Sequence, residues 1–379
     1  MTEPVELVET PAAFAGLLDR IRGEPIVGLD TEAASFHRYR DRVYLLQVSG
    51  ASHTAVVDPL AVGGLPGLDQ LFADPAIEFV FHDADYDLRL IYHEYGYRVT
   101  RLFDTRVAAQ FAGEPAVGLA ALLADRFGVA TDKRFQRADW SSRPLSPAMI
   151  AYAATDTRYL IALRDELRAD LIRLERLAWV EEESQLLTQV EWAPAQPPEE
   201  AFLRFKGART LSRRGLAVLR ELFVWREREA TRLDRATFRI LGNEAILAMA
   251  SDPPRSLDRL GQVRGLGRDL MARRGPELLA AIQRGLDLSE DELPRFERRP
   301  RPRPDPTFDL KLERLKAVRT DLATEYALAP GLLCPNATLE AIARGEPGSP
   351  DDLAATPGMR RWQVAAFGDR LLGAVAGAA

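Results

Sequence analysis

The sequence contains very little cysteine and histidine, and this scarcity excludes several kinds of site. Its 379 residues include one cysteine, Cys334, and four histidines. A single thiol cannot form an internal disulfide, and it cannot build a metal site that needs several cysteines. We therefore expect Cys334 to be a small buried hydrophobe in a protein of the reducing cytoplasm.

Long apolar runs are also lacking. No stretch is long enough to cross a bilayer, so we expect no membrane partner. The first residues, "MTEPVELVETPAAF", are acidic and interrupted by proline, unlike a signal or transit peptide. Hydrophobic residues make up 46% and charged residues 28%, which is typical of a soluble protein with two or three domains. We expect a monomer.

Lysine is nearly absent, so arginine carries almost all of the positive charge. The formal net charge of -6 argues by itself against nucleic-acid binding. Arginine is nevertheless concentrated in residues 204–214, 264–274 and 295–304. A GC-rich genome and a role in binding polyanions both explain this bias, and the composition does not separate them.

The first third of the chain alternates strands and helices in the order of a ribonuclease H-like α/β domain with a mixed sheet. Its first three strands are joined by short connections, which favour antiparallel neighbours. Ser146 and Pro147 begin the longest helical run. The expected strands cover residues 25–32, 42–49, 53–58 and 77–82, and the expected helices cover 85–96, 104–112, 118–127 and 144–177.

The second half of the chain is helical and contains a repeat. The proline-rich segment 191–200 predicts a linker. Beyond it, "NEAILAMASDPPRSLDRLGQVRGLG" begins at Asn243 and "NATLEAIARGEPGSPDDLAATPGMR" begins at Asn336, 93 positions later and in register without gaps. Two copies with this long period indicate a duplicated helical domain rather than a solenoid.

Two acidic residues end the first expected strand, in "IVGLDTEAASF". Asp30 and Glu32 are two positions apart, so they lie on the same face of a strand. Two carboxylates 4 Å apart repel each other by roughly 4 kcal/mol at an effective dielectric constant of 20. Either a cation compensates this repulsion, or the pair is a solvated strand end.

Acidic residues also gather where the fourth strand meets the next helix. In "FVFHDADYDLRL" the strand ends at His82, and Asp83, Asp85 and Asp87 follow it. Acids at a helix start commonly complement the helix macrodipole, and this explains at least one of the three.

A third signal is "YAATD", residues 152–156. Tyr152 and Asp156 are four apart on a helix, so they share a face that is otherwise apolar. Oxygen ligands without cysteine or histidine suit Mg²⁺ or Mn²⁺. Two such ions about 4 Å apart would offset the repulsion, acidify a water and stabilise the departing oxygen of a phosphodiester.

The three segments together resemble a known family. "DTE", "HDADYDL" and "YAATD" are similar to the three exonuclease motifs of the DEDD superfamily, tyrosine-bearing branch. "FDTRVAAQFAGEPAVGLAALLADRFGV" and "DKRFQRADWSSRPLSPAMIAYAATD" resemble ribonuclease D. The repeated unit resembles the HRDC domain. The resemblance implies an exonuclease domain (1–192), two HRDC-like domains (200–287 and 307–379) and an Arg/Pro-rich linker (288–306).

The resemblance also implies an activity: a 3′→5′ exoribonuclease that uses two divalent ions and releases nucleoside 5′-monophosphates. Its partners would be tRNA precursors or other small structured RNAs. Two alternatives stay open, because nothing in the motifs reads the 2′-hydroxyl. One is a DNA-directed 3′→5′ exonuclease, and the other is a catalytically silent RNA-binding scaffold.

The family roles are carried over residue by residue. Asp30 resembles the carboxylate that bridges both metals, Glu32 and Asp156 resemble ligands of the nucleophile-side ion, and Asp87 resembles the ligand that reaches the other ion through water. Tyr152 resembles the residue that orients the attacking water. A phenol with a pKa near 10 is a poor base at neutral pH, which favours positioning.

Several assignments remain open within the resemblance. Asp85 is the rival of Asp87, and Asp104 is expected to cap a helix. The candidates for substrate contacts are Gln47, His82, Lys133, Gln136 and Arg143, with packing or hydrogen bonding the favoured role for His82. The repeats are either spacers or RNA-holding modules. If the repeats hold RNA, the arginines that precede a helix in each copy would contact phosphates. These are Arg264 and Arg268 in the first copy and Arg360 and Arg361 in the second.

Overall fold

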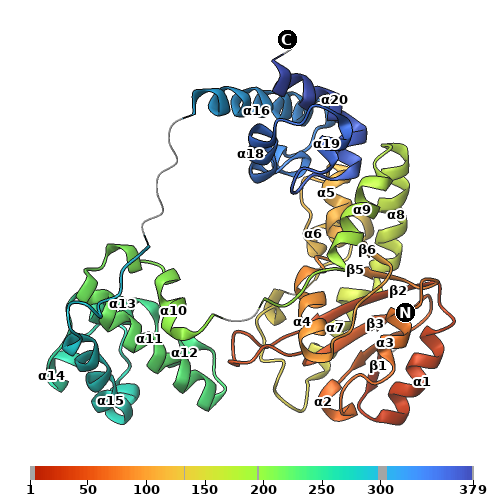
Figure 1. The fold of residues 1–379 in the computed structure, drawn as a ribbon. Helices are drawn as coiled ribbons and strands as arrows, with labels where there is room; N and C mark the ends of the chain where they lie inside the picture. The colour runs from red at the N-terminus through yellow and green to blue at the C-terminus, as the bar shows by residue number, and fades with distance from the viewer. Residues whose placement is uncertain (1–4, 132, 194–195, 298–304, 378–379) are drawn as a thin grey trace.

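The N-terminal part of the molecule is built on a mixed six-stranded sheet (Figure 1). The computed structural model describes residues 5–131, 133–193, 196–297 and 305–377. The spatial order of the strands is β1-β4-β3-β2-β5-β6, and β3 runs antiparallel to both of its neighbours while the other pairings are parallel. The strands are β1 (Val5–Val8), β2 (Ile26–Glu32), β3 (Leu45–Ser49), β4 (Thr54–Val57), β5 (Glu78–Phe81) and β6 (Leu102–Asp104).

The expected strands and their antiparallel order are confirmed. The four predicted segments contain β2, β3, β4 and β5, and the pairs β2–β3 and β3–β4 are antiparallel. The prediction missed β1 and β6, which have four and three residues and are too short for a clear periodicity. Both strands pair in parallel with a neighbour, so their position is fixed by tertiary packing.

The helices of this part surround the sheet. They are α1 (Pro11–Ile21), α2 (Pro59–Val62), α3 (Leu68–Phe72), α4 (Asp85–Tyr95), α5 (Thr105–Ala112), α6 (Leu119–Phe127), the 3₁₀ helix η1 (Lys133–Phe135), α7 (Pro147–Arg158), α8 (Leu160–Arg173) and α9 (Leu177–Leu187). Among the described residues, no helix is both long and apolar enough to span a bilayer.

Helix ends follow the local sequence signals. Ser146 caps α7 by accepting a hydrogen bond from the Met149 amide, and Gly96 ends α4 with a φ of 73°. The single helix expected over 144–177 is wrong. The backbone at Tyr159 has φ -104° and ψ 0°, and this break separates α7 from α8. It lets α7 cover β3 and β4 while α8 packs against α5.

The second half forms two helical domains that repeat each other. The first repeat contains α10 (Pro198–Ala201), η2 (Phe202–Arg204), η3 (Ala208–Thr210), α11 (Arg213–Leu233), α12 (Thr237–Ile240), α13 (Asn243–Ser251), α14 (Leu257–Leu260) and α15 (Arg268–Asp287). The second repeat contains α16 (Pro306–Tyr326), α17 (Pro330–Leu333), α18 (Asn336–Gly345), α19 (Pro350–Ala354) and α20 (Arg361–Ala376). Residues 298–304 of the predicted linker lie outside the described part of the chain.

The duplication is confirmed at the level of single hydrogen bonds. Arg226 donates to Asn243 Oδ1 at 2.7 Å, and Arg319, at the same position of the second copy, donates to Asn336 Oδ1 at 2.7 Å. Both arginines also donate to the backbone carbonyl two residues before that asparagine. Cys334 is buried there, as expected. The two repeats therefore pack in the same way around this arginine and asparagine.

The second repeat docks on the sheet domain through aromatic residues. Trp362 of α20 stacks on Trp179 of α9 with ring centroids 4.5 Å apart, and Phe111 of α5 meets both rings edge-on. Their hydrophobic core is continuous across the two domains. In Figure 1 the second repeat lies against α5 and α9, far from the first repeat.

Two glutamates of α9 complete this interface. Glu182 accepts hydrogen bonds from the backbone amides of Arg361 and Trp362 at 2.8 and 2.9 Å. Glu183 accepts from Arg360 Nε at 3.0 Å and from Trp362 Nε1 at 2.9 Å. Arg360 and Arg361, expected to meet RNA phosphates, are thus engaged by carboxylates of the same chain. A helix N-terminus binds a carboxylate for the same reason that it binds a phosphate.

We predict that Trp362→Ala destabilises this interface by about 3–5 kcal/mol, because it removes a buried aromatic side chain and its hydrogen bond. Trp362→Phe keeps the ring stacking and should cost about 1–2 kcal/mol. Urea unfolding would measure both variants, and small-angle scattering would report whether the second repeat separates. A stability of Trp362→Ala equal to that of the parent would contradict the prediction.

Candidate active site

The carboxyl end of β2 places two carboxylates beneath α7. Asp30 and Glu32 lie on one face of β2, and the register pairs Asp30 with Gln47 of β3. Helix α7 approaches this face closely because Gly28 has no side chain. A methyl group at Gly28 would lie 3.1 Å from the carbonyl oxygen of Thr157. The glycine therefore allows the helix that carries Asp156 to sit directly over the strand that carries Asp30.

The buried carboxylate of Asp104 directs helix α4 toward the two acids of β2. Asp104 caps α5, as expected, and its carboxylate also accepts from the amides of Asp83 and Ala84 at 3.2 and 2.7 Å. Asp83 adopts a left-handed backbone with a φ of 68°, so the chain turns sharply from β5 into α4. This turn brings the first turn of α4, with Asp87, toward the end of β2.

Asp87 and Asp85 have different surroundings. Asp87 is buried and accepts a hydrogen bond from the hydroxyl of Thr31, which lies between the two acids of β2. Asp85 forms an ion pair with Arg89 at 2.7 Å on the outer face of α4. Asp87 lines the cavity that contains Asp30 and Glu32. The geometry therefore favours Asp87 over Asp85 as the acid of the second motif that takes part in the site.

Helix α7 supplies the last two side chains. Tyr152 and Asp156 lie one turn apart, and a hydrogen bond from Tyr152 reaches the Asp156 carboxylate. The Tyr152 ring stacks on buried Trp140, with centroids 6.1 Å apart, and it lies 5.6 Å from the ring of Phe135. Aromatic packing therefore fixes the direction of the phenol.

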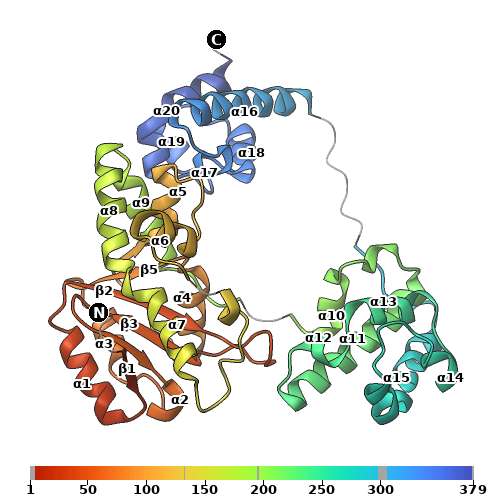
Figure 2. The same cartoon turned by 180° about the vertical axis from the view of Figure 1, so that it is seen from behind.

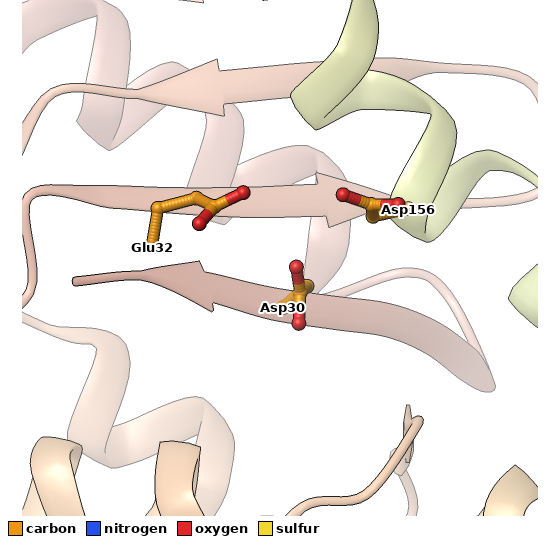
Figure 3. Close-up of side chains that lie close together, drawn as sticks. All are labelled: Asp30, Glu32 and Asp156. Carbon is orange, nitrogen blue, oxygen red and sulfur yellow. The ribbon is translucent and has the colours of Figure 1, made fainter. Parts of the chain in front are cut away.

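The acidic side chains converge on one cavity of about 310 Å³. Carboxylate oxygens of Asp30, Glu32 and Asp156 all lie within 4.8 Å of one another, and Figure 3 shows these three groups pointing toward a common point. Asp87 and Tyr152 line the same cavity. Four acids spread over the first 156 positions of the sequence are therefore neighbours in space.

Burial raises the pKa of all four acids, and repulsion between the carboxylates adds to this effect at Asp30 and Glu32. Loss of solvent raises the pKa of Asp30 well above its usual value, and the charges of Asp87, Asp156 and Glu32 raise it further. The pKa of Glu32 is raised for the same reasons. Burial raises the pKa of both Asp87 and Asp156 to about 7. Among the described residues, the charges that raise the pKa of Asp30 and Glu32 are therefore those of other acids in the cluster.

Comparison with known proteins explains this arrangement. The profile described as 3'-5' exonuclease matches residues 5–172, and the HRDC domain profile matches residues 215–282 and 311–375. Ribonuclease D of Gluconacetobacter diazotrophicus is 35% identical over 374 residues, which cover 98% of this chain and 92% of that protein. The chain belongs to the ribonuclease D family.

Solved structures agree with this ribonuclease D assignment. The crystal structure of Escherichia coli RNase D, an exoribonuclease involved in structured RNA processing, superposes with a TM-score of 0.70 at 26% identity and covers 99% of both chains. The catalytic core of RRP6 from Trypanosoma brucei superposes with a TM-score of 0.69 at 27% identity, covering 76% of this chain and 82% of that one. The chain is a 3′→5′ exoribonuclease with two HRDC domains.

The residues of this ribonuclease D site fit divalent metal ions. The donors are carboxylate oxygens, which hard divalent cations prefer, and they are close enough to share an ion. The raised pKa values of Asp30 and Glu32 indicate the same need, because a cation would hold both groups in the ionised form. The family and the acidic cluster together indicate divalent-metal dependence.

The side chains predicted to contact substrate differ from one another in their surroundings and burial. Gln136 is exposed and lines the acidic cavity. Gln47 is fully buried beside Asp30, and neither of its amide atoms has a hydrogen-bond partner. His82 hydrogen-bonds the Thr105 hydroxyl at 2.9 Å, and burial lowers its pKa to about 4. This agrees with the hydrogen-bonding role favoured for it.

The remaining two predicted contacts are Arg143, which lies outside the cavity lining, and Lys133. Arg143 donates to the Asp58 carboxylate and to the carbonyls of Trp140 and Tyr44, so its guanidinium already has partners. Its predicted substrate contact would have to compete with this network. Lys133 begins η1, and its side chain lies outside the described part of the chain.

Sequence reasoning missed the aromatic rim of the cavity. Phe36 and Tyr86 are 43% and 41% exposed and line it, together with Arg137, whose guanidinium lies 5.0 Å from the Phe36 ring centroid. Exposed aromatic rings of this kind offer flat surfaces to nucleic-acid bases. The available signal was their position: Phe36 follows the first acidic motif by four residues, and Tyr86 immediately precedes Asp87.

The first HRDC domain holds the loop that carries Phe36. Asp234, which ends α11, accepts from the amides of Tyr39 and Arg40 at 3.2 and 3.3 Å. Arg239 of α12 donates to the Phe36 carbonyl at 2.6 Å. The chain segment directly after the catalytic strand is therefore fixed by a domain more than 190 residues away in sequence.

We predict that Asp156→Asn stabilises the metal-free enzyme more at pH 8 than at pH 5. The pKa of Asp156 is about 7 in the folded protein, above its usual 3.8, so the folded state binds this proton more tightly than the unfolded state. Ionisation therefore lowers the free energy of unfolding as pH rises from about 4 to 7. We expect Asp156→Asn to raise the free energy of unfolding at pH 8 by at least about 1.4 kcal/mol, which corresponds to a pKa difference of one unit.

Chemical unfolding in EDTA at both pH values would measure this gain. Asp85→Asn serves as the control, because Asp85 is paired with Arg89 outside the cluster. An equal gain for Asp156→Asn at pH 5 and pH 8 would show that ionisation of the buried Asp156 carboxyl is not its cause.

Proposed function

We propose that this exoribonuclease holds two divalent ions, Mg²⁺ or Mn²⁺, through Asp30, Glu32, Asp87 and Asp156, and releases nucleoside 5′-monophosphates from RNA 3′ ends. The observation that carries the proposal is the meeting of these carboxylates in one cavity with raised pKa values. Its proposed substrates are tRNA precursors and other small structured RNAs. The ribonuclease D relatives support this substrate class.

The four acids have distinct proposed roles. The charges of Asp87, Asp156 and Glu32 all act on Asp30, which suits a carboxylate shared by both ions. Among the described residues, Asp87 does not join the group of carboxylates that lie within 4.8 Å of one another. Its bond to Thr31 supports a longer-range role, through water. The ions would acidify the attacking water and stabilise the departing 3′ oxygen.

Tyr152 positions the attacking water in this proposal. Its hydroxyl donates to Asp156, and a phenol oxygen that donates one hydrogen bond can also accept one from water. The stacked ring of Trp140 restricts the phenol to one direction. A tyrosine held this way orients a nucleophile without giving up its own proton.

The rim of the cavity would hold the 3′-terminal nucleotides. Phe36 and Tyr86 provide stacking surfaces, and each stacked base contributes about 1–3 kcal/mol. Arg137 and Gln136 supply hydrogen-bond donors at the same rim. The acidic floor would repel phosphates without metal, so the ions and these donors together make the cavity compatible with RNA.

We expect Asp30→Ala to abolish hydrolysis while RNA binding in EDTA stays within about twofold, because basic and aromatic surfaces hold the substrate. Digestion of 3′- and 5′-labelled RNA and DNA with Mg²⁺, Mn²⁺ or EDTA would measure cation dependence, polarity and sugar preference together. Release of the 3′ label as a mononucleotide is the expected result. Activity of Asp30→Ala near that of the parent would place the chemistry elsewhere.

Asp87 and Asp85 form a matched pair on one helix. We predict that Asp87→Asn lowers kcat at least roughly 10²-fold, because it removes a metal ligand, whereas Asp85→Asn stays near the parent. Single-turnover rates at saturating RNA and a range of Mn²⁺ concentrations would separate metal affinity from chemistry. A larger loss for Asp85→Asn would reverse the assignment.

A further inference from the structure

The two HRDC domains carry a hollow at the same position. In the first domain it has a volume of about 300 Å³, and in the second about 490 Å³. Each is formed by the end of one helix (α13 or α18), the short helix after it (α14 or α19) and the following loop. Residues at equivalent positions, 93 apart, line both: Ala248 and Ala341, Asp252 and Gly345, Pro254 and Pro347, Arg259 and Asp352, Gln262 and Ala355, Val263 and Thr356, Arg264 and Pro357.

The backbone of the two hollows is alike. Ser256 caps α14 and Ser349 caps α19, each accepting from the amide three residues later. Gly265 and Gly358 turn the following loop with φ values of 84° and 81°. A difference between the hollows in what they bind must therefore come from the side chains.

The side chains that line the two hollows carry opposite net charge. Arg259 and Arg264 line the first hollow, whereas Asp352 and Pro357 occupy these positions in the second, where Glu346 adds another acid. Arg255 stands next to the first hollow, and its counterpart is Gly348. The duplicated scaffold has thus become basic in one copy and acidic in the other.

The arginines of the first hollow are available to a ligand. Arg259 is 65% exposed, and its only ion pair with a described residue is a loose one of 3.7 Å with Asp252, which is 88% exposed. Arg264 is exposed and forms no ion pair with any described residue. In Figures 1 and 2, α14 lies at the outer edge of the domain, on the side turned away from the sheet.

We infer that the first hollow, lined by Arg259 and Arg264, binds the phosphodiester backbone of single-stranded RNA upstream of the 3′ end, and that the second hollow does not. Two exposed guanidinium groups at the mouth of a concave surface match adjacent phosphates along a strand. The corresponding surface of the second domain is acidic, and its neighbouring Arg360 is engaged by Glu183. This inference rests on the proposed RNA substrate and extends it.

The test compares Arg259→Ala/Arg264→Ala with Arg344→Ala/Arg370→Ala in the full-length protein. The control pair has the same change in net charge and lies on the second domain, where both arginines are exposed or partly exposed. Affinity for a fluorescent 24-nucleotide single-stranded RNA would be measured in EDTA over a range of salt concentrations. Hydrolysis of a tetranucleotide with Mn²⁺ would be measured in parallel.

We expect the first-hollow variant to bind the long RNA at least roughly tenfold more weakly at 0.15 M salt. Its slope of log affinity against log salt should fall by about 1.4, because each single-strand phosphate contact contributes about 0.7. Tetranucleotide hydrolysis should stay within twofold of the parent, since so short a substrate does not extend to the hollow. Arg259→Asp, which installs the residue of the second copy, should weaken long-RNA binding further.

Two results would overturn the inference: parental affinity of the first-hollow variant, or an equal loss in the control pair. Either result leaves the proposed function standing if the parent still degrades RNA from the 3′ end. A parent that degrades no RNA would instead contradict the proposed function, while the binding comparison would still report on the hollow.

Discussion

The constraint on which the site depends is electrostatic: Asp30, Glu32, Asp87 and Asp156 line one cavity and lie largely out of solvent. Burial raises the pKa of all four carboxylates, and their like charges raise the pKa of Asp30 and Glu32 further. The fold holds them there with ordinary structural devices. Gly28 admits α7, Asp104 fixes the turn before α4, and Trp140 orients Tyr152. A divalent metal then converts an unfavourable cluster into a binding site.

The duplicated HRDC domain illustrates how one scaffold takes two roles. Both copies keep the buried arginine–asparagine bond and the same helix order. The second copy uses the N-terminus of α20 to bind Glu182 and becomes part of the core of the exonuclease domain. In the first copy the corresponding helix begins at Arg268, which is exposed. The difference lies in a few surface residues, because the packing requirements of the interior are unchanged.

Much of this architecture could be predicted from the sequence. The central strands, the repeat and the acidic motifs have clear periodicities or spacings, and the expected antiparallel order of β2, β3 and β4 was correct. The family match supplied the activity. Strands β1 and β6 were missed because segments of four and three residues carry too little pattern. The break at Tyr159 was missed because its cause is the packing of α7 and α8 on different partners.

The hydrogen-bond and ion-pair partners of single side chains were the part of the structure least predictable from the sequence. The guanidinium groups of Arg143 and Arg360 were predicted to be available to substrate, but carboxylates distant in sequence bind them. Gln47 lies beside Asp30, in the interior rather than at the surface that RNA would reach. An arginine in a sequence shows only its charge, and the fold decides whether an acid of the same chain neutralises it.

The carboxylate of Asp234 has a consequence for how this protein can be dissected or recombined. It occupies two amides of the loop that bears Phe36, so cutting the chain before the helical half would leave those amides to water and release the rim of the nucleotide pocket. A truncated nuclease would therefore report a damaged catalytic centre as well as a missing tether. For the same reason the first helical module cannot be swapped for an unrelated one without redesigning the segment that it steadies.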